Sequence, residues 1–400
     1  MRILIINKLL AKVFGGTEKH IKEIIIHLSN QGHEITILTE KGNSKNLEEI
    51  KSLKNIRIVF LPSTEVTFKS YKNFKHTEFY EKIKGSPYLW KIFILLKKII
   101  SFKKNFKWIL NSIGWVYHNK KKFDVISVHF YYEFEIAKFI KKFFKIPYVA
   151  VLESYSYLEA DSIKKSKFVM TISKFIKDEC EKIHNFSPKL IPIGIDSINF
   201  KKFKKSKVSQ IKRDYSSNGE KIILNVARLV EGKGVRNMIE AAGIILNKRR
   251  DVNFIVCGDG LERKNFEELI KQLGIERNFH LVKVFGKDLI DYYNSADLFV
   301  HTPDLSNHFG IVYLEAMSAG LPIIATNYEA TPSTVGNAAL LVPIESPLEL
   351  SKAISKLIDN PRLCKRLSYN GLKRVKEKFN WDKITPELER FYKMASNLSG

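Results

Sequence analysis

Short apolar segments alternate with segments of helical periodicity along the whole chain, and this alternation most restricts its fold. Strand-like runs include 2–7, 34–39 and 124–130, and a second series begins at 221–229 and continues through 252–258. Such alternation is typical of parallel sheets whose faces are covered by helices. We therefore predict an α/β protein of two doubly wound, Rossmann-like domains facing a cleft, with ligands beyond the carboxyl ends of the strands.

The formal net charge of +25 favours an anionic partner, such as nucleic acid, a membrane surface or a phosphorylated ligand. Between Lys82 and Lys122 there are eleven lysines and no acidic residue. Apolar residues recur there at helical spacing, namely Leu89, Ile92, Phe93, Leu96, Ile100, Phe106, Leu110, Ile113 and Tyr117.

A helix with an apolar stripe beside many lysines can lie on an anionic bilayer surface, and we predict this role for the Lys82–Lys122 segment. The alternative is a helix that faces the core and leaves its lysines in solvent. The sequence has no nucleic-acid recognition motif or arginine cluster, so a nucleic-acid partner is not expected.

Cysteine usage and the N-terminus predict the compartment. Cys180, Cys257 and Cys364 are far apart and form no C-x-x-C motif, which suggests a reducing environment. The N-terminal apolar run is too short for a signal peptide, and no run approaches the ~18 residues that a membrane span needs. We therefore expect a cytoplasmic protein, peripheral on the inner face of the cell membrane.

Residues 296–326 predict a strand at 298–301, a loop, a helix at about 309–319 and a second strand. Gly320 and Pro322 are typical stop signals for such a helix. The backbone amides that open it would be unpaired, and such a helix end attracts phosphate or sugar oxygens. An ordinary strand–helix–strand unit explains the apolar residues equally well.

This helix supplies a set of candidate ligand contacts. The amides expected to face the ligand are those of Phe309, Gly310, Ile311 and Val312. Glu315 lies about one turn further along and can hold vicinal hydroxyls through both carboxylate oxygens.

Two other loops have residues suited to phosphate groups. Gly15 and Gly16 lack the Cβ atoms that would block close backbone approach, and Thr17 can cap the helix that follows. Arg228 stands at a strand end and Lys233 lies five residues later, so both can converge on one phosphate. A Gly-Gly turn and a strand-end arginine are each also common without a ligand.

Together these motifs resemble those of the family 4 retaining glycosyltransferases, which have the GT-B fold. Members carry a Glu, then Phe-Gly, then a second Glu eight positions after the first, followed by A-M-A-x-G-x-P. The chain resembles this pattern from Phe309 onward, including Glu315. GGTEKH at 15–20 and ARLVEGKG at 227–234 also resemble family motifs, and the order of the motifs agrees along nearly the whole chain.

The resemblance implies retaining transfer of a sugar from a UDP- or GDP-linked donor to a hydroxyl acceptor, with no other cofactor. We expect a lipid-linked or cell-surface glycan acceptor, of the capsule, lipopolysaccharide or exopolysaccharide type. The sequence has no D-x-D motif, so we expect no metal. Arg228, Lys233 and the amides of 15–16 and 310–312 would stabilise the leaving diphosphate, while Glu315 holds the ribose.

The resemblance also implies three regions. Residues 1–198 would form the acceptor-side domain, with the basic insertion at about 82–122. Residues 199–375 would form the nucleotide-sugar domain, and a helix within 376–400 would pack back on the first domain.

Glu153 occupies the place where family members carry a His, counted from Pro147. We predict that it accepts a hydrogen bond from a sugar hydroxyl or takes the acceptor's proton; pairing with a nearby lysine, without a role in the chemistry, is the alternative. His129 matches the second His of the family's D-V-I-H-A-H motif, and Ser127 replaces the first.

Asn307 and His308 are the other departure, because they replace the family's first Glu and the Gly that follows. An amide keeps hydrogen-bonding capacity but loses the charge. We expect altered donor-sugar preference, with Asn307 at the catalytic position and His308 contacting the donor. A weakened enzyme, a non-catalytic partner of another transferase and a sugar-nucleotide epimerase are the alternatives.

Overall fold

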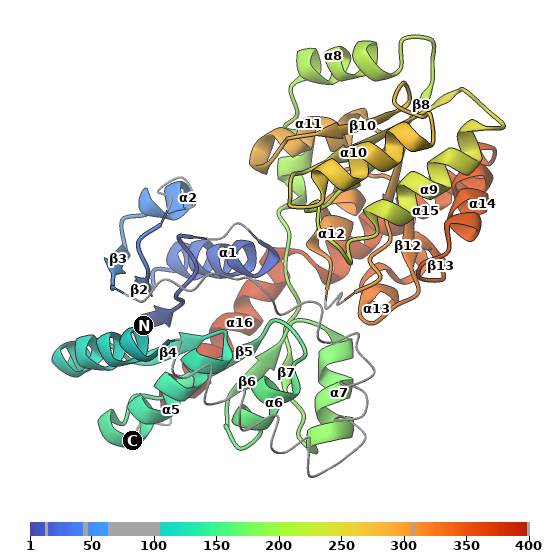
Figure 1. The fold of residues 1–400 in the computed structure, drawn as a ribbon. Helices are drawn as coiled ribbons and strands as arrows, with labels where there is room; N and C mark the ends of the chain where they lie inside the picture. The colour runs from blue at the N-terminus through green and yellow to red at the C-terminus, as the bar shows by residue number, and fades with distance from the viewer. Residues whose placement is uncertain (13–14, 43–46, 63–104, 306–308, 398–400) are drawn as a thin grey trace. The chain divides into compact units, whose positions relative to one another are not determined.

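The computed structural model describes residues 1–12, 15–42, 47–62, 105–305 and 309–397 (Figure 1). The chain divides into two compact units. Unit 1 comprises Met1–Ile172, Ile176–Ile191 and Thr385–Gly400, and unit 2 comprises Ser173–Phe175 and Pro192–Ile384. These limits lie several residues from the predicted limits at 198 and 375.

Unit 1 contains a parallel sheet with the strand order β3-β2-β1-β4-β5-β6-β7. The strands are β1 (Arg2–Ile6), β2 (Glu34–Thr39), β3 (Ile56–Phe60), β4 (Val125–Val128), β5 (Tyr148–Leu152), β6 (Val169–Thr171) and β7 (Lys189–Leu190). Every residue of β4 and β5 is buried, as expected for strands covered on both faces. The strand order reverses at β1 and β4, where ligands of such sheets bind.

The described helices of unit 1 include a helix over 105–119, which belongs to the predicted basic insertion. The others are α1 (Gly16–Asn30), α2 (Glu48–Lys51), η3 (Lys120–Lys122), α5 (Tyr131–Phe144), α6 (Tyr157–Ile163) and α7 (Lys174–His184). The first two residues of α7, Lys174 and Phe175, group with unit 2. The rest of the insertion, 82–104, lies outside the described residues.

Unit 2 contains a parallel sheet with the order β10-β9-β8-β11-β12-β13. Its strands are β8 (Lys221–Val226), β9 (Val252–Cys257), β10 (Phe279–Val282), β11 (Leu298–His301), β12 (Ile323–Thr326) and β13 (Ala339–Val342). The order reverses at β8 and β11. The two parallel α/β sheets that the alternating pattern predicts are thus present.

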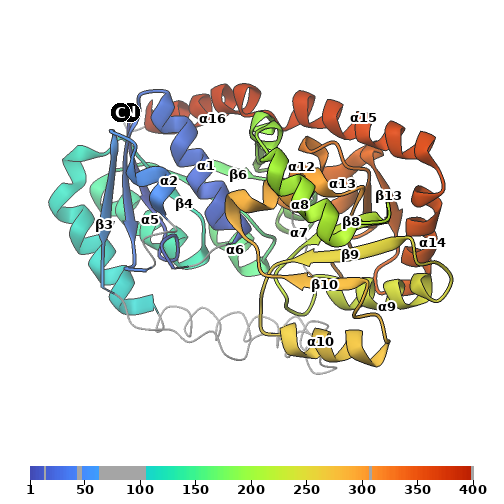
Figure 2. The ribbon, with the colours of Figure 1, turned by 90° about the horizontal axis from the view of Figure 1, so that it is seen from above.

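Helices cover both faces of the unit 2 sheet; in Figure 2, α9 and α10 lie on one side of β9 and β10, and α12 and α15 on the other. The helices are η4 (Ser197–Lys201), α8 (Lys205–Tyr215), α9 (Val235–Leu246), α10 (Arg263–Gln272), η5 (Gly286–Asp288), α11 (Leu289–Ser295), α12 (Ile311–Ser318), α13 (Thr331–Val335), η6 (Gly336–Ala338), α14 (Pro347–Ile358), α15 (Pro361–Lys378) and α16 (Trp381–Ser396). The core includes Met238, Leu246, Phe254, Phe266 and Phe279.

The last helix, α16, contributes to both units. It groups with unit 2 as far as Ile384 and with unit 1 from Thr385 onward. Within the described part of the chain, no helix is both long enough and apolar enough to span a bilayer.

Candidate functional site

Three loops at the carboxyl edge of the unit 2 sheet pack tightly on one another. They follow β8, β9 and β11. Gly234 has φ +72°, and a Cβ there would lie 1.9 Å from the carbonyl oxygen of Thr302. Gly258 has φ +154°, and its Cβ would lie 1.9 Å from the carbonyl oxygen of Ala227. The glycines therefore bring the three loops together, because no side chain fits at these contacts.

The β8–α9 loop carries both basic residues predicted to bind phosphate. Arg228 is exposed and Lys233 is half-buried. The pKa of His301 is lowered to about 3, mainly by burial and to a smaller extent by the charge of Lys233. Burial raises the pKa of Asp304, which the charge of Lys233 opposes. Lys233 thus lies near the end of β11, where the loop that leads to α12 begins.

Helix α12 begins at Ile311, two residues later than predicted. Gly310 is its N-cap residue, with φ +82°, a conformation that a residue with a Cβ rarely adopts. Phe309 is buried, and its ring packs edge-on against Phe379 with centroids 5.8 Å apart. The amides of Ile311 and Val312 therefore belong to the first turn, whereas Phe309 and Gly310 precede the helix.

Glu315 is only 6% exposed, and its Oε2 accepts a hydrogen bond of 2.7 Å from the hydroxyl of Tyr293. Tyr293 lies on α11 and is fully buried. One carboxylate oxygen thus already accepts a hydrogen bond within unit 2, and the use of both oxygens for vicinal hydroxyls stays a prediction. Sequence reasoning missed Tyr293, since nothing in the sequence pairs it with a residue 22 positions later.

In unit 1, helix α1 begins at Gly16, and Gly15 is its N-cap residue with extended backbone at φ −145°. Thr17 lies inside the helix, so its predicted capping role is wrong, and no side-chain hydrogen bond caps this end. Both glycines are described, whereas Val13 and Phe14 before them lie outside the described residues.

Glu153 directly follows β5 and is bound by two histidines. Its Oε1 lies 2.8 Å from Nδ1 of His20 on α1 and 3.0 Å from Nδ1 of His129, which directly follows β4. Its side chain is 3% exposed. Burial alone would raise the pKa of Glu153, but the charge of His20 and the hydrogen bonds from both histidines outweigh it, so the pKa falls to about 2. The partners are histidines, not the lysine that the sequence suggested.

The hydrogen bonds continue from His129 to the C-terminal helix. Nε2 of His129 lies 3.2 Å from Oγ of Ser127, which lies 2.6 Å from the hydroxyl of Tyr392 on α16. The ionised Glu153 only accepts, so Nδ1 of both histidines must carry hydrogen. Burial lowers the pKa of His129, so its neutral ring accepts at Nε2. Ser127 therefore donates to His129 and accepts from Tyr392.

Glu133, on α5, is another buried carboxylate at this edge that the sequence did not single out. It accepts backbone hydrogen bonds from Lys8, His129 and Phe130 at 3.1, 3.0 and 3.2 Å. Burial raises its pKa to about 8, and these amides oppose the shift. Glu133 thus joins the end of β1 to the end of β4, where the strand order reverses.

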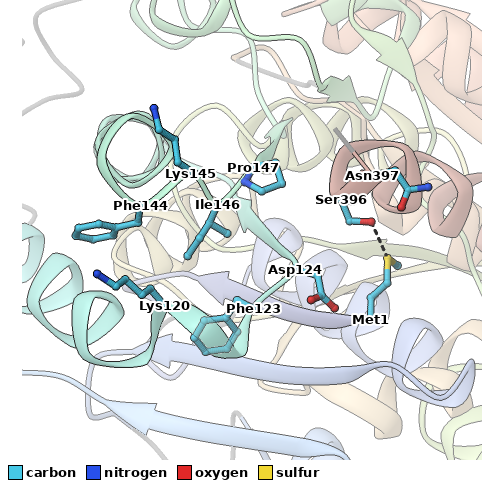
Figure 3. A pocket seen from close by; sticks show the side chains of 10 residues that line it. All are labelled: Met1, Lys120, Phe123, Asp124, Phe144, Lys145, Ile146, Pro147, Ser396 and Asn397. Carbon is cyan, nitrogen blue, oxygen red and sulfur yellow. Dashed lines mark hydrogen bonds between the residues drawn. The ribbon is translucent and has the colours of Figure 1, made fainter. Parts of the chain in front are cut away.

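A cavity of about 590 Å³ lies at the opposite, amino edge of the unit 1 sheet (Figure 3). It is lined by Met1, Lys120, Phe123, Asp124, Phe144, Lys145, Ile146, Pro147, Ser396 and Asn397. None of these is a predicted catalytic or donor-binding residue, although Lys120 belongs to the predicted membrane segment. Asn307 and His308, which are predicted site residues, lie outside the described residues.

Comparison with known proteins identifies the class to which this fold belongs. The model of "Glycosyltransferase Family 4" matches residues 14–197, and that of "Glycosyl transferases group 1" matches residues 207–374. An uncharacterized glycosyltransferase of Methanocaldococcus jannaschii is 25% identical, over 97% of each chain.

Solved structures give the same fold. Sucrose-phosphate synthase from Thermosynechococcus elongatus superimposes with a TM-score of 0.79 at 19% identity, over 98% of each chain. Anabaena HepE in complex with UDP-glucose superimposes with a TM-score of 0.75 at 16% identity, over 98% of each chain. The protein has the GT-B fold. It belongs to the group 1 glycosyltransferases, with a family 4 N-terminal half.

Proposed function

We propose that this protein is a retaining, metal-independent glycosyltransferase that uses a UDP- or GDP-linked sugar. The observation that carries the proposal is the carboxyl edge of unit 2, where glycine packing brings the loop of Arg228 and Lys233 against the loop before α12. Both loops belong to the unit that the group 1 model matches. HepE, a structural neighbour, has been solved with UDP and with UDP-glucose.

In this proposal the chain itself stabilises the charge of the leaving diphosphate. Arg228 and Lys233 supply the cations, and the first-turn amides of Ile311 and Val312 supply dipoles that helix α12 holds in place. Glu315, whose Oε2 accepts from Tyr293, would also accept a hydrogen bond from a ribose hydroxyl. The proposal that the amides of Gly15 and Gly16 also stabilise the diphosphate rests on the sequence motif alone.

Glu153 is better suited to positioning than to direct proton transfer, since it is buried and bonded to two imidazoles. Asn307 and His308 are proposed to set the preference for the donor sugar. For the acceptor we propose a lipid-linked or cell-surface glycan, which fits the lysine-rich insertion and a peripheral location on the inner face of the membrane.

A thermal-shift panel of nucleoside diphosphates and nucleotide sugars tests the donor site. At about 100 times Kd, the right nucleotide should stabilise the protein by about 2.7 kcal/mol. Arg228→Ala should abolish the shift, whereas Arg236→Ala, which removes an exposed arginine of the same unit, should preserve it. An unchanged shift in Arg228→Ala would refute the assignment of the site.

An assay of nucleotide-sugar turnover distinguishes the proposed function from the alternatives. Transfer to a native glycolipid extract supports the proposal. Nucleotide-sugar binding without any transfer indicates a non-catalytic partner, and conversion of the donor sugar without acceptor indicates an epimerase. In a transfer assay, Asn307→Glu should change the ratio of kcat/KM between donor sugars without abolishing UDP or GDP binding.

A further inference from the structure

The described part of the basic insertion exposes the apolar stripe that the sequence pattern singles out. In the helix over 105–119, the core-facing residues are Trp108, Ile109 and Val116. The exposed residues on the other side are Phe106, Leu110 and Tyr117, with exposed fractions of 47%, 51% and 52%. The helix therefore packs one apolar stripe into the core and leaves a second apolar stripe exposed to solvent.

Helix α5 adds exposed aromatic residues to this stripe. Phe139 and Phe143, one turn apart, are 39% and 56% exposed, with ring centroids 4.4 Å apart. Phe144 connects the helices, because its ring lies 6.2 Å from that of Phe139 and 5.8 Å from that of Tyr117.

Lysines are packed among these rings. The Nζ of Lys120 lies 4.5 Å from the ring centroid of Tyr117 and 5.6 Å from that of Phe144. The Nζ of Lys142 lies 5.3 Å from the ring centroid of Phe143. We call this set the aromatic–lysine surface: Phe106, Leu110, Tyr117, Phe139, Phe143, Phe144, Lys120 and Lys142.

The charge around the aromatic–lysine surface is strongly positive. Residues 105–145 contain eight lysines and only three acidic residues. Asp124 is bonded to Arg2 at 2.6 Å, Glu133 to buried amides, and Glu135 to Lys138 at 2.6 Å. The acidic residues are thus engaged within the fold, and they neutralise few of the exposed lysines.

We propose that the aromatic–lysine surface docks unit 1 on an anionic phospholipid bilayer. Aromatic rings enter the headgroup region, and the lysines remain at the level of the lipid phosphates. Anionic lipid fits better than a second copy of this chain, because two such surfaces would repel each other.

A polar recess adjoins the surface and suits a lipid headgroup. Lys120 and Phe144 of the surface also line the cavity at the amino edge of the sheet, together with Lys145 (Figure 3). Positive charge and exposed apolar side chains thus lie next to each other on this surface. Binding to an anionic membrane uses both, whereas binding to an anion in water uses only the charge. The inference extends the proposed membrane location and specifies the described residues that contact lipid.

Vesicle flotation of the full-length protein tests the proposal, with phosphatidylcholine vesicles compared with vesicles of roughly one third phosphatidylglycerol. We expect at least about tenfold tighter binding to the anionic vesicles, weakened by added salt. The double variant Phe139→Ser/Phe143→Ser should lose about tenfold or more. The triple variant Lys120→Gln/Lys141→Gln/Lys142→Gln, which includes the exposed lysine next to Lys142 on α5, should lose about fivefold per lysine.

The matched controls lie in unit 2. Leu348→Ser/Tyr369→Ser removes two side chains that are 53% and 66% exposed, and Lys356→Gln/Lys376→Gln/Lys378→Gln removes three exposed lysines. Both controls should bind vesicles like the wild type, and all variants should keep the wild-type melting temperature.

Three results would overturn the proposal: equal binding to both kinds of vesicle, equal losses in surface and control variants, or RNA binding lost with the lysines while vesicle binding persists. The nucleotide thermal shift is measured on the same variants. A wild-type protein that shows the nucleotide shift but binds anionic vesicles no better than neutral ones contradicts this inference alone. A wild-type protein that binds anionic vesicles as expected but shows no shift with any nucleotide contradicts the proposed donor site alone.

Discussion

The carboxyl edges of the two sheets are built in opposite ways. In unit 2, glycines pack three loops together, and Arg228 remains exposed at the end of β8. In unit 1, Glu133, His129 and Glu153 are buried at the corresponding edge, where their polar atoms bond to other groups of the same unit. One edge leaves the charge of Arg228 exposed, while the other engages its ionisable side chains in hydrogen bonds within the fold. This contrast predicts where substitutions change stability and where they change binding.

The glycine contacts of unit 2 should give the largest effect on stability. Gly234→Ala places a Cβ against the Thr302 carbonyl at positive φ, so we expect a loss of about 3 kcal/mol or more in the free energy of unfolding. Gly219→Ala is the matched control, since Gly219 also has positive φ, +85°, but open space around its Cβ position. It should lose only about 1 kcal/mol. Similar urea midpoints for the two variants would contradict the packing role of Gly234.

The unit 1 network should appear as a dependence of stability on pH. The folded pKa of Glu153, about 2, lies below the ordinary value of 4.5. Its contribution is therefore complete above about pH 4.5 and is lost as pH falls toward 2. Glu153→Gln should cost on the order of 2–3 kcal/mol near pH 7 and little at pH 2. A difference from the wild type that does not change between pH 5 and pH 2.5 would contradict the ionised state.

Breaking the far end of the same network should have a smaller effect. Tyr392→Phe removes the hydroxyl that donates to Ser127, so we expect a loss of about 1 kcal/mol. Tyr369→Phe, at a site that is 66% exposed, should change the free energy of unfolding by less than about 0.5 kcal/mol. Histidine NMR offers a second measurement, because the Nε2 resonance of His129 should shift in Tyr392→Phe and stay unchanged in Tyr369→Phe.

Arg228→Ala should have the smallest effect on stability and therefore tests the contrast most sharply. Arg228 is exposed, so without ligand its loss should change the free energy of unfolding by less than about 0.5 kcal/mol. The same variant is expected to lose nucleotide stabilisation entirely. A large loss of stability without ligand would mean that the unit 2 edge also uses its charge structurally.

Periodicity was sufficient to predict most of the fold. Apolar runs predicted β1, β4, β8 and β9, with each end within three residues of the observed one, because strands buried on both faces are mostly apolar. The start of α12 was predicted two residues early, since the pattern cannot show that Gly310 adopts positive φ. Thr17 was assigned as a cap for a similar reason, as composition does not fix which residue begins a helix.

The sequence by itself determined the two α/β units, the family and the position of Arg228 at a strand end, because local periodicity and short motifs encode these features. Tertiary structure alone decided which ionisable groups meet. His20, His129 and Glu153 come from three separate elements, and Tyr293 reaches Glu315 from a neighbouring helix. The physical reason is that burial and long-range hydrogen bonds fix the charge and orientation of a side chain, and neither is set by its neighbours along the chain.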